Sequence, residues 1–144
     1  YGEKMMSHKE KVQAFLKQHK YMTLATATLD GKPEAATVEF LVDGDDIIIN
    51  SYVSYRKYDN ITKNPRVACV VTEGDNLTLQ LDGTIVQLSG NDADDAKQKL
   101  LVFEPEFEEY FNDPATRFFK ISPYWMRLRD YTEIPETEII WEKS

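Results

Sequence analysis

The chain is poor in the residues that form disulfides and most metal centres. It has one cysteine, Cys69, and two histidines, His8 and His19, among 144 residues. A single cysteine cannot form an internal disulfide, and two histidines leave a metal centre short of ligands. We therefore expect Cys69 to be a buried core thiol, both histidines to lie on the surface or at a helix end, and no metal to be bound.

Long apolar segments are also lacking. The longest apolar runs, residues 47–49 and 67–71, are far shorter than the roughly 20 residues that span a bilayer. Residues 1–4 contain no apolar region typical of a signal peptide. We expect a soluble cytoplasmic protein without a membrane partner, and a length of 144 residues predicts a single domain over residues 1–144.

Cations are in the minority, and they are unevenly distributed. The chain has 17 Lys and Arg against 25 Asp and Glu, a net charge of −8. Residues 54–66 nevertheless carry +3 and residues 117–129 carry +4, which leaves −15 for the remainder. Because so acidic a body repels phosphate backbones, general nucleic-acid binding is excluded, and two small basic segments favour a compact anionic ligand.

Alternating apolar and polar residues predict a mainly β protein. The predicted strands are residues 22–28, 33–42, 47–51, 67–72, 76–89, 117–121, 124–128 and 138–141. Short Asp-Gly turns connect successive strands, which favours antiparallel pairing, and Gly83 predicts a bulge within the longest strand. We expect about six of these strands to form the barrel itself, closed or partly closed, with the remainder in the C-terminal tail.

Three helices are expected beside the barrel. The first spans residues 7–20, with Ser7 as N-cap and Glu10 three residues later in a capping-box pattern. The second spans residues 54–64 and is ended by Pro65. The third spans residues 92–111 and carries an apolar stripe interrupted by Pro105.

The start of the second helix has an unusual charge. With Ser54 as N-cap, Arg56 and Lys57 fall in the first turn, where the helix dipole disfavours each cation by roughly 0.3–1 kcal/mol. An anion bound there would reverse this effect, because free N–H groups, a hydroxyl and two cations would converge on it. The alternative is that both side chains simply extend into water.

Four short motifs follow one another in a set order between residues 15 and 90. They are Leu24-Ala25-Thr26, Asp30-Gly31-Lys32-Pro33, Ser54-Tyr55-Arg56-Lys57 and Asn64-Pro65-Arg66-Val67. This ordered set resembles the pyridoxamine 5′-phosphate oxidase-like family of FMN-binding split barrels, and the segment 118–125 is also similar to short members. The resemblance implies a six-stranded antiparallel split β-barrel with flanking α-helices, forming a homodimer with FMN at the subunit interface.

The resemblance also implies which residues bind FMN. They are Ala36, Thr37, Val38, Glu39, Asn50, Ser51, Arg56, Lys57, Thr78, Gln80 and Trp125. In such proteins a hydroxyl residue and an Arg-Lys pair hold the phosphate, which here are Ser51, Arg56 and Lys57. Residues 36–39 would follow the isoalloxazine ring, and Thr78 or Gln80 would face it. Trp125 would cover the ring from the partner subunit or, alternatively, pack in the core.

Some departures from the family pattern bear on the substrate. Pyridoxamine-phosphate oxidases carry an Arg and a Lys on the second strand, where this chain has Ala36 and Leu41. Their C-terminal Arg-x-His motif is matched only by Arg127-Leu128-Arg129, without a histidine. We therefore expect no oxidation of pyridoxamine phosphate, and FMN binding with fewer phosphate contacts, so that the protein purifies partly empty.

Bound FMN would supply the redox chemistry, so no catalytic side chain is predicted. The sequence favours an oxidoreductase that passes a hydride between a nicotinamide or other small reductant and a small acceptor. One alternative is a binding protein on the same fold: a flavin-binding or stress-related protein without turnover, or a binder of haem or deazaflavin. Another is a small oligonucleotide-binding barrel, which the −15 remainder disfavours.

Overall fold

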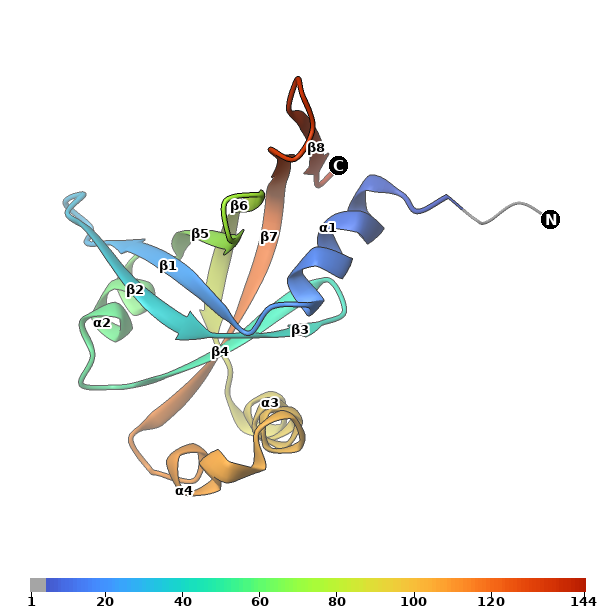
Figure 1. The fold of residues 1–144 in the computed structure, drawn as a ribbon. Coiled ribbons are helices and arrows are strands. Elements are labelled where there is room, and N and C mark those ends of the chain that lie inside the picture. The colour runs from blue at the N-terminus through green and yellow to red at the C-terminus, as the bar shows by residue number, and fades with distance from the viewer. Residues whose placement is uncertain (1–4) are drawn as a thin grey trace.

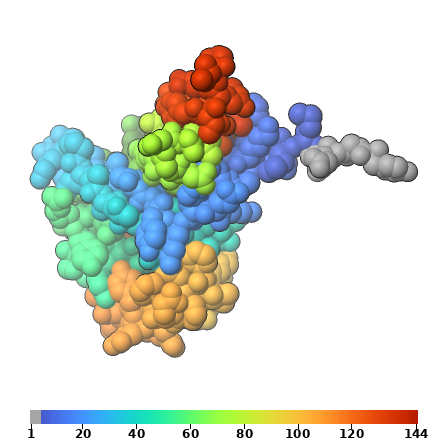
Figure 2. Space-filling model, in the orientation of Figure 1, coloured from blue at the N-terminus to red at the C-terminus, as the bar shows by residue number. Residues whose placement is uncertain are grey.

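A strongly curved antiparallel sheet forms the centre of the molecule, and helices lie on both sides of it and below it (Figure 1). The computed structural model describes residues 5–144. Residues 1–4, on which the expectation about a signal peptide depends, lie outside the described part of the chain. In the space-filling view the segment of residues 90–111 forms the lower end of the molecule, while the C-terminal segment lies at the upper end (Figure 2).

Strands contribute most of the regular structure. In chain order they are β1 (Tyr21–Ala27), β2 (Pro33–Glu39), β3 (Leu41–Asp43), β4 (Asp46–Tyr52), β5 (Arg66–Glu73), β6 (Leu77–Gln87), β7 (Thr116–Asp130) and β8 (Thr137–Glu142). The helices are α1 (His8–Lys17), α2 (Arg56–Lys63), α3 (Gly90–Phe103) and α4 (Glu108–Phe111), with a 3-10 turn, η1 (Pro105–Phe107), before α4.

The strand order is β2-β1-β5-β6-β7-β4-β3, with β8 added beside β7, and every pairing is antiparallel. This arrangement confirms the predicted mainly β split barrel with flanking helices. The sheet has eight strands among the described residues rather than six. One reason is that the predicted strand 33–42 is divided at the buried Phe40 into β2 and β3.

Two predicted strands, 117–121 and 124–128, are one continuous strand, β7, in spite of Pro123. β4 pairs with β7 up to Ile121, and β8 pairs with it from Trp125 onward. Pro123 therefore falls between these two partners, where its missing N–H breaks no hydrogen bond of either ladder. The predicted bulge is confirmed between Asp82 and Gly83, where the β6–β7 register shifts.

The helices follow the predicted pattern, with changes at their ends. Ser7 caps α1 as expected, since its Oγ accepts from the Glu10 N–H at 3.1 Å. The N-cap of α2 is Tyr55 rather than Ser54, and it makes no side-chain capping bond. The third predicted helix ends at Phe103, and Pro105 begins the 3-10 turn that precedes α4.

The core has two parts. The larger part fills the barrel and includes Phe40, Phe119 and Cys69, which confirms Cys69 as a buried thiol. The smaller part, around Leu100 and Phe111, packs α3 and α4 against the sheet. Each large side chain buried in this way contributes roughly 1.5–3 kcal/mol to folding. No helix in the described part of the chain is both long and apolar enough to cross a membrane.

Candidate functional site

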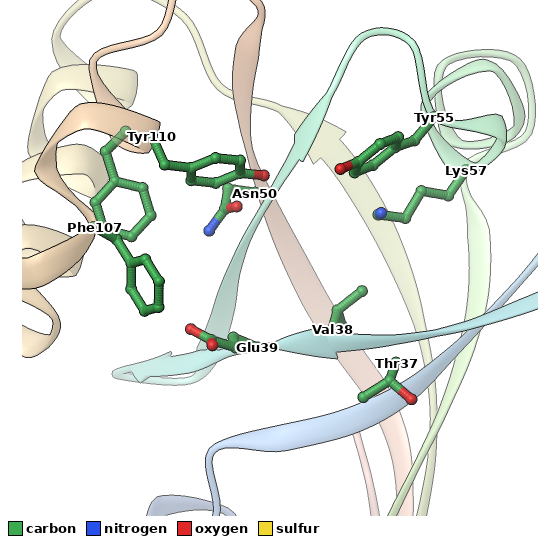
Figure 3. Close-up of a pocket in the computed structure, with 9 residues that line it drawn as sticks. Thr37, Val38, Glu39, Asn50, Tyr55, Lys57, Phe107 and Tyr110 are labelled. Carbon is green, nitrogen blue, oxygen red and sulfur yellow. The ribbon is translucent and has the colours of Figure 1, made fainter.

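Two neighbouring cavities lie between β2, the end of β4 and the start of α2, and Figure 3 shows residues that line the first of them. The first, of about 300 Å³, is lined by Thr37, Val38, Glu39, Asn50, Tyr55, Lys57, Phe107, Tyr110 and Phe111. The second, of about 350 Å³, is lined by Leu24, Thr26, Glu34, Ala35, Ala36, Ser54, Tyr55, Arg56 and Lys57. Tyr55 and Lys57 border both cavities, so a ligand longer than either could extend from one to the other.

Lys57 is the cation at the junction of the two cavities. Its side chain is half-buried, and this desolvation lowers the pKa of its ammonium group. The ammonium lies 4.4 Å from the centre of the Tyr55 ring. Across residues 5–144, no carboxylate oxygen comes within 4.0 Å of it. A partly desolvated cation without a counter-ion favours the binding of an anion.

Arg56, the adjacent residue, has a carboxylate partner. Its guanidinium lies 2.5 Å from Glu34 of β2, whose side chain is only 9% exposed. Asn60, on the next turn of α2, donates to the other Glu34 oxygen at 2.9 Å and to the Thr26 hydroxyl at 3.0 Å. The pKa of Glu34 is held below its ordinary value, chiefly by the hydrogen bond from Asn60 and to a smaller extent by the positive charge of Arg56.

Aromatic side chains form the wall opposite α2. Tyr110 of α4 packs edge-on against Tyr52 with ring centres 4.5 Å apart, and Tyr52 contacts Tyr55 in the same way at 5.4 Å. Phe107 adds a further ring, and Figure 3 shows it on the side of the first cavity away from Lys57. Burial raises the pKa of Tyr110 to about 12, so its phenol stays protonated.

Glu39 lies at the end of β2, on the Phe107 side of the first cavity. Glu39 pairs with Tyr21 across the β1–β2 ladder, and Lys20, the residue before Tyr21, forms an ion pair with Glu104, a residue only 2% exposed. Burial, together with the neighbouring Glu104 carboxyl, raises the pKa of Glu39 to about 7. One end of the first cavity is thus cationic, and the other holds two carboxyl groups.

Most of the residues implied by the resemblance gather here. Thr37, Val38, Glu39, Asn50 and Lys57 line the first cavity, and Ala36 and Arg56, with Lys57, line the second. Ser51 does not reach either cavity, because its buried hydroxyl donates to the Tyr52 carbonyl at 3.1 Å.

Thr78, Gln80 and Trp125 lie elsewhere in this chain. Cross-strand pairs connect Thr37 to Thr23, Thr23 to Val70, and Val70 to Gln80. Three strand spacings therefore separate Gln80 from the cavity wall, a distance of roughly 14 Å. Gln80 instead accepts a hydrogen bond from Arg127, whose guanidinium lies 5.6 Å from the centre of the Trp125 ring.

Several residues of the two cavities are not among the predicted site residues, including Tyr55, Phe107, Tyr110 and Glu34. The aromatic stripe of residues 103–111 was visible, but its spacing predicts a packing face and not a cavity wall. Among residues 5–144, no three His, Cys, Asp or Glu side chains are grouped in a way that could hold a metal ion.

Comparison with known proteins identifies the class to which this fold and site belong. The three-dimensional structure is similar to HutZ, the haem storage protein of Vibrio cholerae (TM-score 0.69, 16% identity, 82% of this chain and 91% of that one). It is also similar to a Clostridium acetobutylicum protein related to general stress protein 26 (TM-score 0.72, 16% identity, covering 95% and 96%). PhzG of Burkholderia lata, in complex with tetrahydrophenazine-1-carboxylic acid, matches as well (TM-score 0.71, 15% identity, covering 93% and 83%).

These similarities define a common split-barrel fold, since identities this low show the fold alone. Residues 8–130 match the family of pyridoxamine 5′-phosphate oxidase, which covers most of the chain. The protein therefore belongs to the pyridoxamine 5′-phosphate oxidase family. No curated protein sequence matches it significantly.

Proposed function

We propose that the protein binds FMN across the two cavities and acts as an oxidoreductase between a small reductant and a small acceptor. The observation that carries this proposal is Lys57, a half-buried ammonium with no carboxylate oxygen of residues 5–144 within 4.0 Å, situated where a polar and an aromatic cavity meet. A ligand with a planar ring and a phosphate matches this division. The two volumes also lie in the lower part of the roughly 300–1,000 Å³ range of small-molecule sites.

The phosphate would bind in the second cavity. Lys57 and Arg56 supply cations, and the first N–H groups of α2 point outward without a side-chain cap. Ser54 also lines this cavity, so it would take the place of the buried Ser51 as the hydroxyl donor.

The ring would bind in the first cavity. Val38 and Tyr110 supply apolar and aromatic contact, and Asn50 supplies an amide that can both donate and accept. FMN, when bound, supplies the hydride chemistry itself. The residues present would bind and orient the ring and exclude water from it.

A homodimer would complete the site. Thr78 and Gln80 lie on β6, about three strands along the sheet from β2 of their own chain, and Trp125 lies on β7; all three are on the outward face of the sheet. That face carries small side chains, including Ala25, Ala68 and Val70, which suit close packing of two sheets. Gln80 or Trp125 of a second copy could then reach a ring that residues 36–39 hold.

Haem is the competing ligand, because HutZ is described as a haem storage protein. A haem iron takes a histidine, cysteine, methionine or tyrosinate as axial ligand. Among the described residues, the only such side chains lining the two cavities are Tyr55 and Tyr110, and the raised pKa of Tyr110 disfavours a tyrosinate. PhzG, by contrast, is described in complex with tetrahydrophenazine-1-carboxylic acid, a ring compound with one carboxylic acid group. FMN is therefore favoured.

Titration with FMN and with riboflavin, followed by flavin fluorescence, tests the proposal. The double variant Arg56→Ala/Lys57→Ala should bind FMN at least tenfold more weakly, or about 1.4 kcal/mol, with little change for riboflavin, which lacks the phosphate. Lys63→Ala, at the other end of α2, is the matched control. Unchanged FMN affinity in the double variant contradicts the phosphate site. A haem absorbance band in the purified protein, without a flavin band, contradicts the cofactor.

Anaerobic mixing of the FMN-loaded protein with NADH or NADPH tests the enzymatic part of the proposal separately. Bleaching of the flavin band within seconds is expected for an oxidoreductase. A flavin that no nicotinamide reduces would indicate a carrier, the non-catalytic alternative.

A further inference from the structure

The carboxyl pair at the far end of the first cavity is the feature that phosphate and ring binding leave unexplained. Glu104 lies in the turn between α3 and η1 and is only 2% exposed. Apart from the Lys20 ammonium, no group among residues 5–144 donates a hydrogen bond to its oxygens. A buried carboxylate with so few donors is costly, and a protonated neighbour would relieve this cost.

Glu39 is that neighbour. It lines the cavity, and its cross-strand partner Tyr21 follows Lys20, the residue whose ammonium pairs with Glu104. The negative charges of two neighbouring carboxylates repel, so a proton stays on Glu39 until the pH approaches 7. While that proton is bound, Lys20 balances the negative charge of the pair.

The other groups that face the pair are Tyr21 and Tyr110. Tyr21 is the cross-strand partner of Glu39, and Tyr110, which lines the same cavity, is buried with its phenol protonated. Neither adds a charge. This end of the cavity is thus neutral overall while the proton is bound, and it becomes anionic when the proton leaves.

We propose that Glu39, kept protonated by Glu104, is a specificity-determining residue. It selects a ligand that has an anionic group at one end and an uncharged hydrogen-bond acceptor, such as a ring carbonyl or ring nitrogen, at the other. The proposal deepens the proposed function and rests on it. A ligand with an anion at each end would be repelled by the carboxyl pair at this end of the cavity. A ligand with a cation at this end would favour loss of the proton from the pair.

The proton also makes ligand binding depend on pH. The pKa of Glu39 is raised to about 7, so the pair loses its proton over the range in which the protein is easily studied. Loss of the proton turns a donor into an acceptor that repels the ligand's carbonyl or nitrogen. FMN affinity should therefore fall as the pH rises through 7.

Fluorescence titration with FMN between pH 6 and pH 8.5 tests this in four proteins: the wild type, Glu39→Gln, Glu104→Gln and the exposed control Glu108→Gln. The wild type and the control should lose about fivefold in affinity across the range, equivalent to about 1 kcal/mol. Glu39→Gln, which keeps a neutral donor at every pH, should bind tightly throughout. The phosphate of FMN also titrates in this pH range, and it does so equally for all four proteins. Dividing each variant's Kd by the wild-type Kd at the same pH therefore cancels the contribution of the phosphate.

Glu104→Gln distinguishes the pair from a general effect of charge. Without Glu104, Glu39 would form its own ion pair with Lys20 and stay ionised, so FMN affinity should be low and nearly constant with pH. The proposal is overturned if Glu39→Gln follows the pH dependence of the wild type, or if Glu104→Gln behaves as the wild type does.

A measurement without ligand separates this inference from the proposed function. If none of the four proteins binds FMN, the proposed function fails. The titration of the carboxyl pair can still be measured by carbon NMR of the glutamate side chains. A carboxyl that titrates near pH 7 in the wild type and disappears in Glu39→Gln supports the shared proton. A wild type in which every glutamate titrates below pH 5 overturns it.

Discussion

Glu34 and Glu39 lie five residues apart on the same strand, β2, and line adjacent cavities, yet their surroundings have opposite effects. The pKa of Glu34 is held below its ordinary value, whereas that of Glu39 is raised to about 7. Glu34 meets two donors from α2, Asn60 and Arg56. Glu39 meets a second carboxyl, Glu104, from the turn after α3.

The difference teaches that β2 itself does not determine the charge of either carboxyl group. The elements packed against each end of the strand do. α2 brings donors that stabilise a carboxylate, while the α3–η1 turn brings an acceptor that favours the carboxylic acid. One strand thereby lines a cavity for an anion at one end and a neutral donor at the other.

The largest effect is expected from Asn60→Ala. Asn60 is 5% exposed and donates to both Glu34 and Thr26, so its removal leaves two acceptors with one donor fewer. The free energy of unfolding should fall by about 1–3 kcal/mol, measured by urea denaturation. Thr62→Ala is the control, since the Thr62 hydroxyl contacts only carbonyls of its own helix. A loss of less than about 0.5 kcal/mol would mean that Glu34 does not depend on Asn60.

The next effect separates the two adjacent cations. Because Arg56 is paired with Glu34 and Lys57 is not, Lys57→Ala should weaken FMN binding about tenfold, whereas Arg56→Ala should weaken it about threefold or less. Isothermal titration calorimetry of both single variants measures the difference. Equal losses would show that Glu34 does not reduce the contribution of Arg56.

Much of the fold was predictable from local sequence signals. Alternation and Asp-Gly turns predict the hairpins, Gly83 predicts the bulge, and Ser7 predicts the start of α1. What local signals miss is determined by pairing between distant segments. Pro123 predicts a break in the tail strand, but β7 continues because Pro123 falls between the partners β4 and β8.

The site was predictable in part, for a similar reason. The Arg56-Lys57 pair stands out from its position at a helix start, and residues 37–39 follow from the resemblance. Glu104 does not stand out, because it lies 65 residues from Glu39 and only the packing of α3 against the sheet brings it near. Nor could the sequence show that Arg56 is neutralised by Glu34 while Lys57 is not.

The pH dependence of stability should differ at the two ends of the strand. Since the pKa of Glu39 is raised from 4.5 to about 7, the folded state binds more protons in that window, and the free energy of unfolding falls as the pH rises through it. Because Glu39 is partly exposed and solvent screens its charge, we expect the free energy of unfolding to decline by only about 1 kcal/mol. This decline should be absent in Glu39→Gln. For Glu34, with a lowered pKa, stability is present above 4.5 and lost as the pH falls below it.

Urea denaturation of the wild type, Glu39→Gln and Glu34→Gln from pH 3.5 to pH 8 measures both effects. Glu39→Gln should flatten the profile only on the neutral side, and Glu34→Gln only on the acid side. Variants that flatten the same side would remove the contrast between the two carboxyl groups.

The smallest effect concerns the carboxylate that neutralises Arg56. Glu34→Gln keeps an oxygen to accept from Asn60 but removes the charge that pairs with Arg56, so the guanidinium becomes available to a phosphate in the second cavity. FMN affinity should rise about threefold, or about 0.6 kcal/mol, while riboflavin affinity stays unchanged. Asp59→Asn, an exposed neutralisation on the same helix, is the control for net charge. If the control raises FMN affinity equally, the gain comes from overall charge. If the gain appears in Glu34→Gln alone and is lost when Arg56→Ala is added, Glu34 restrains Arg56 directly, and the paired end of β2 limits how tightly the phosphate is held.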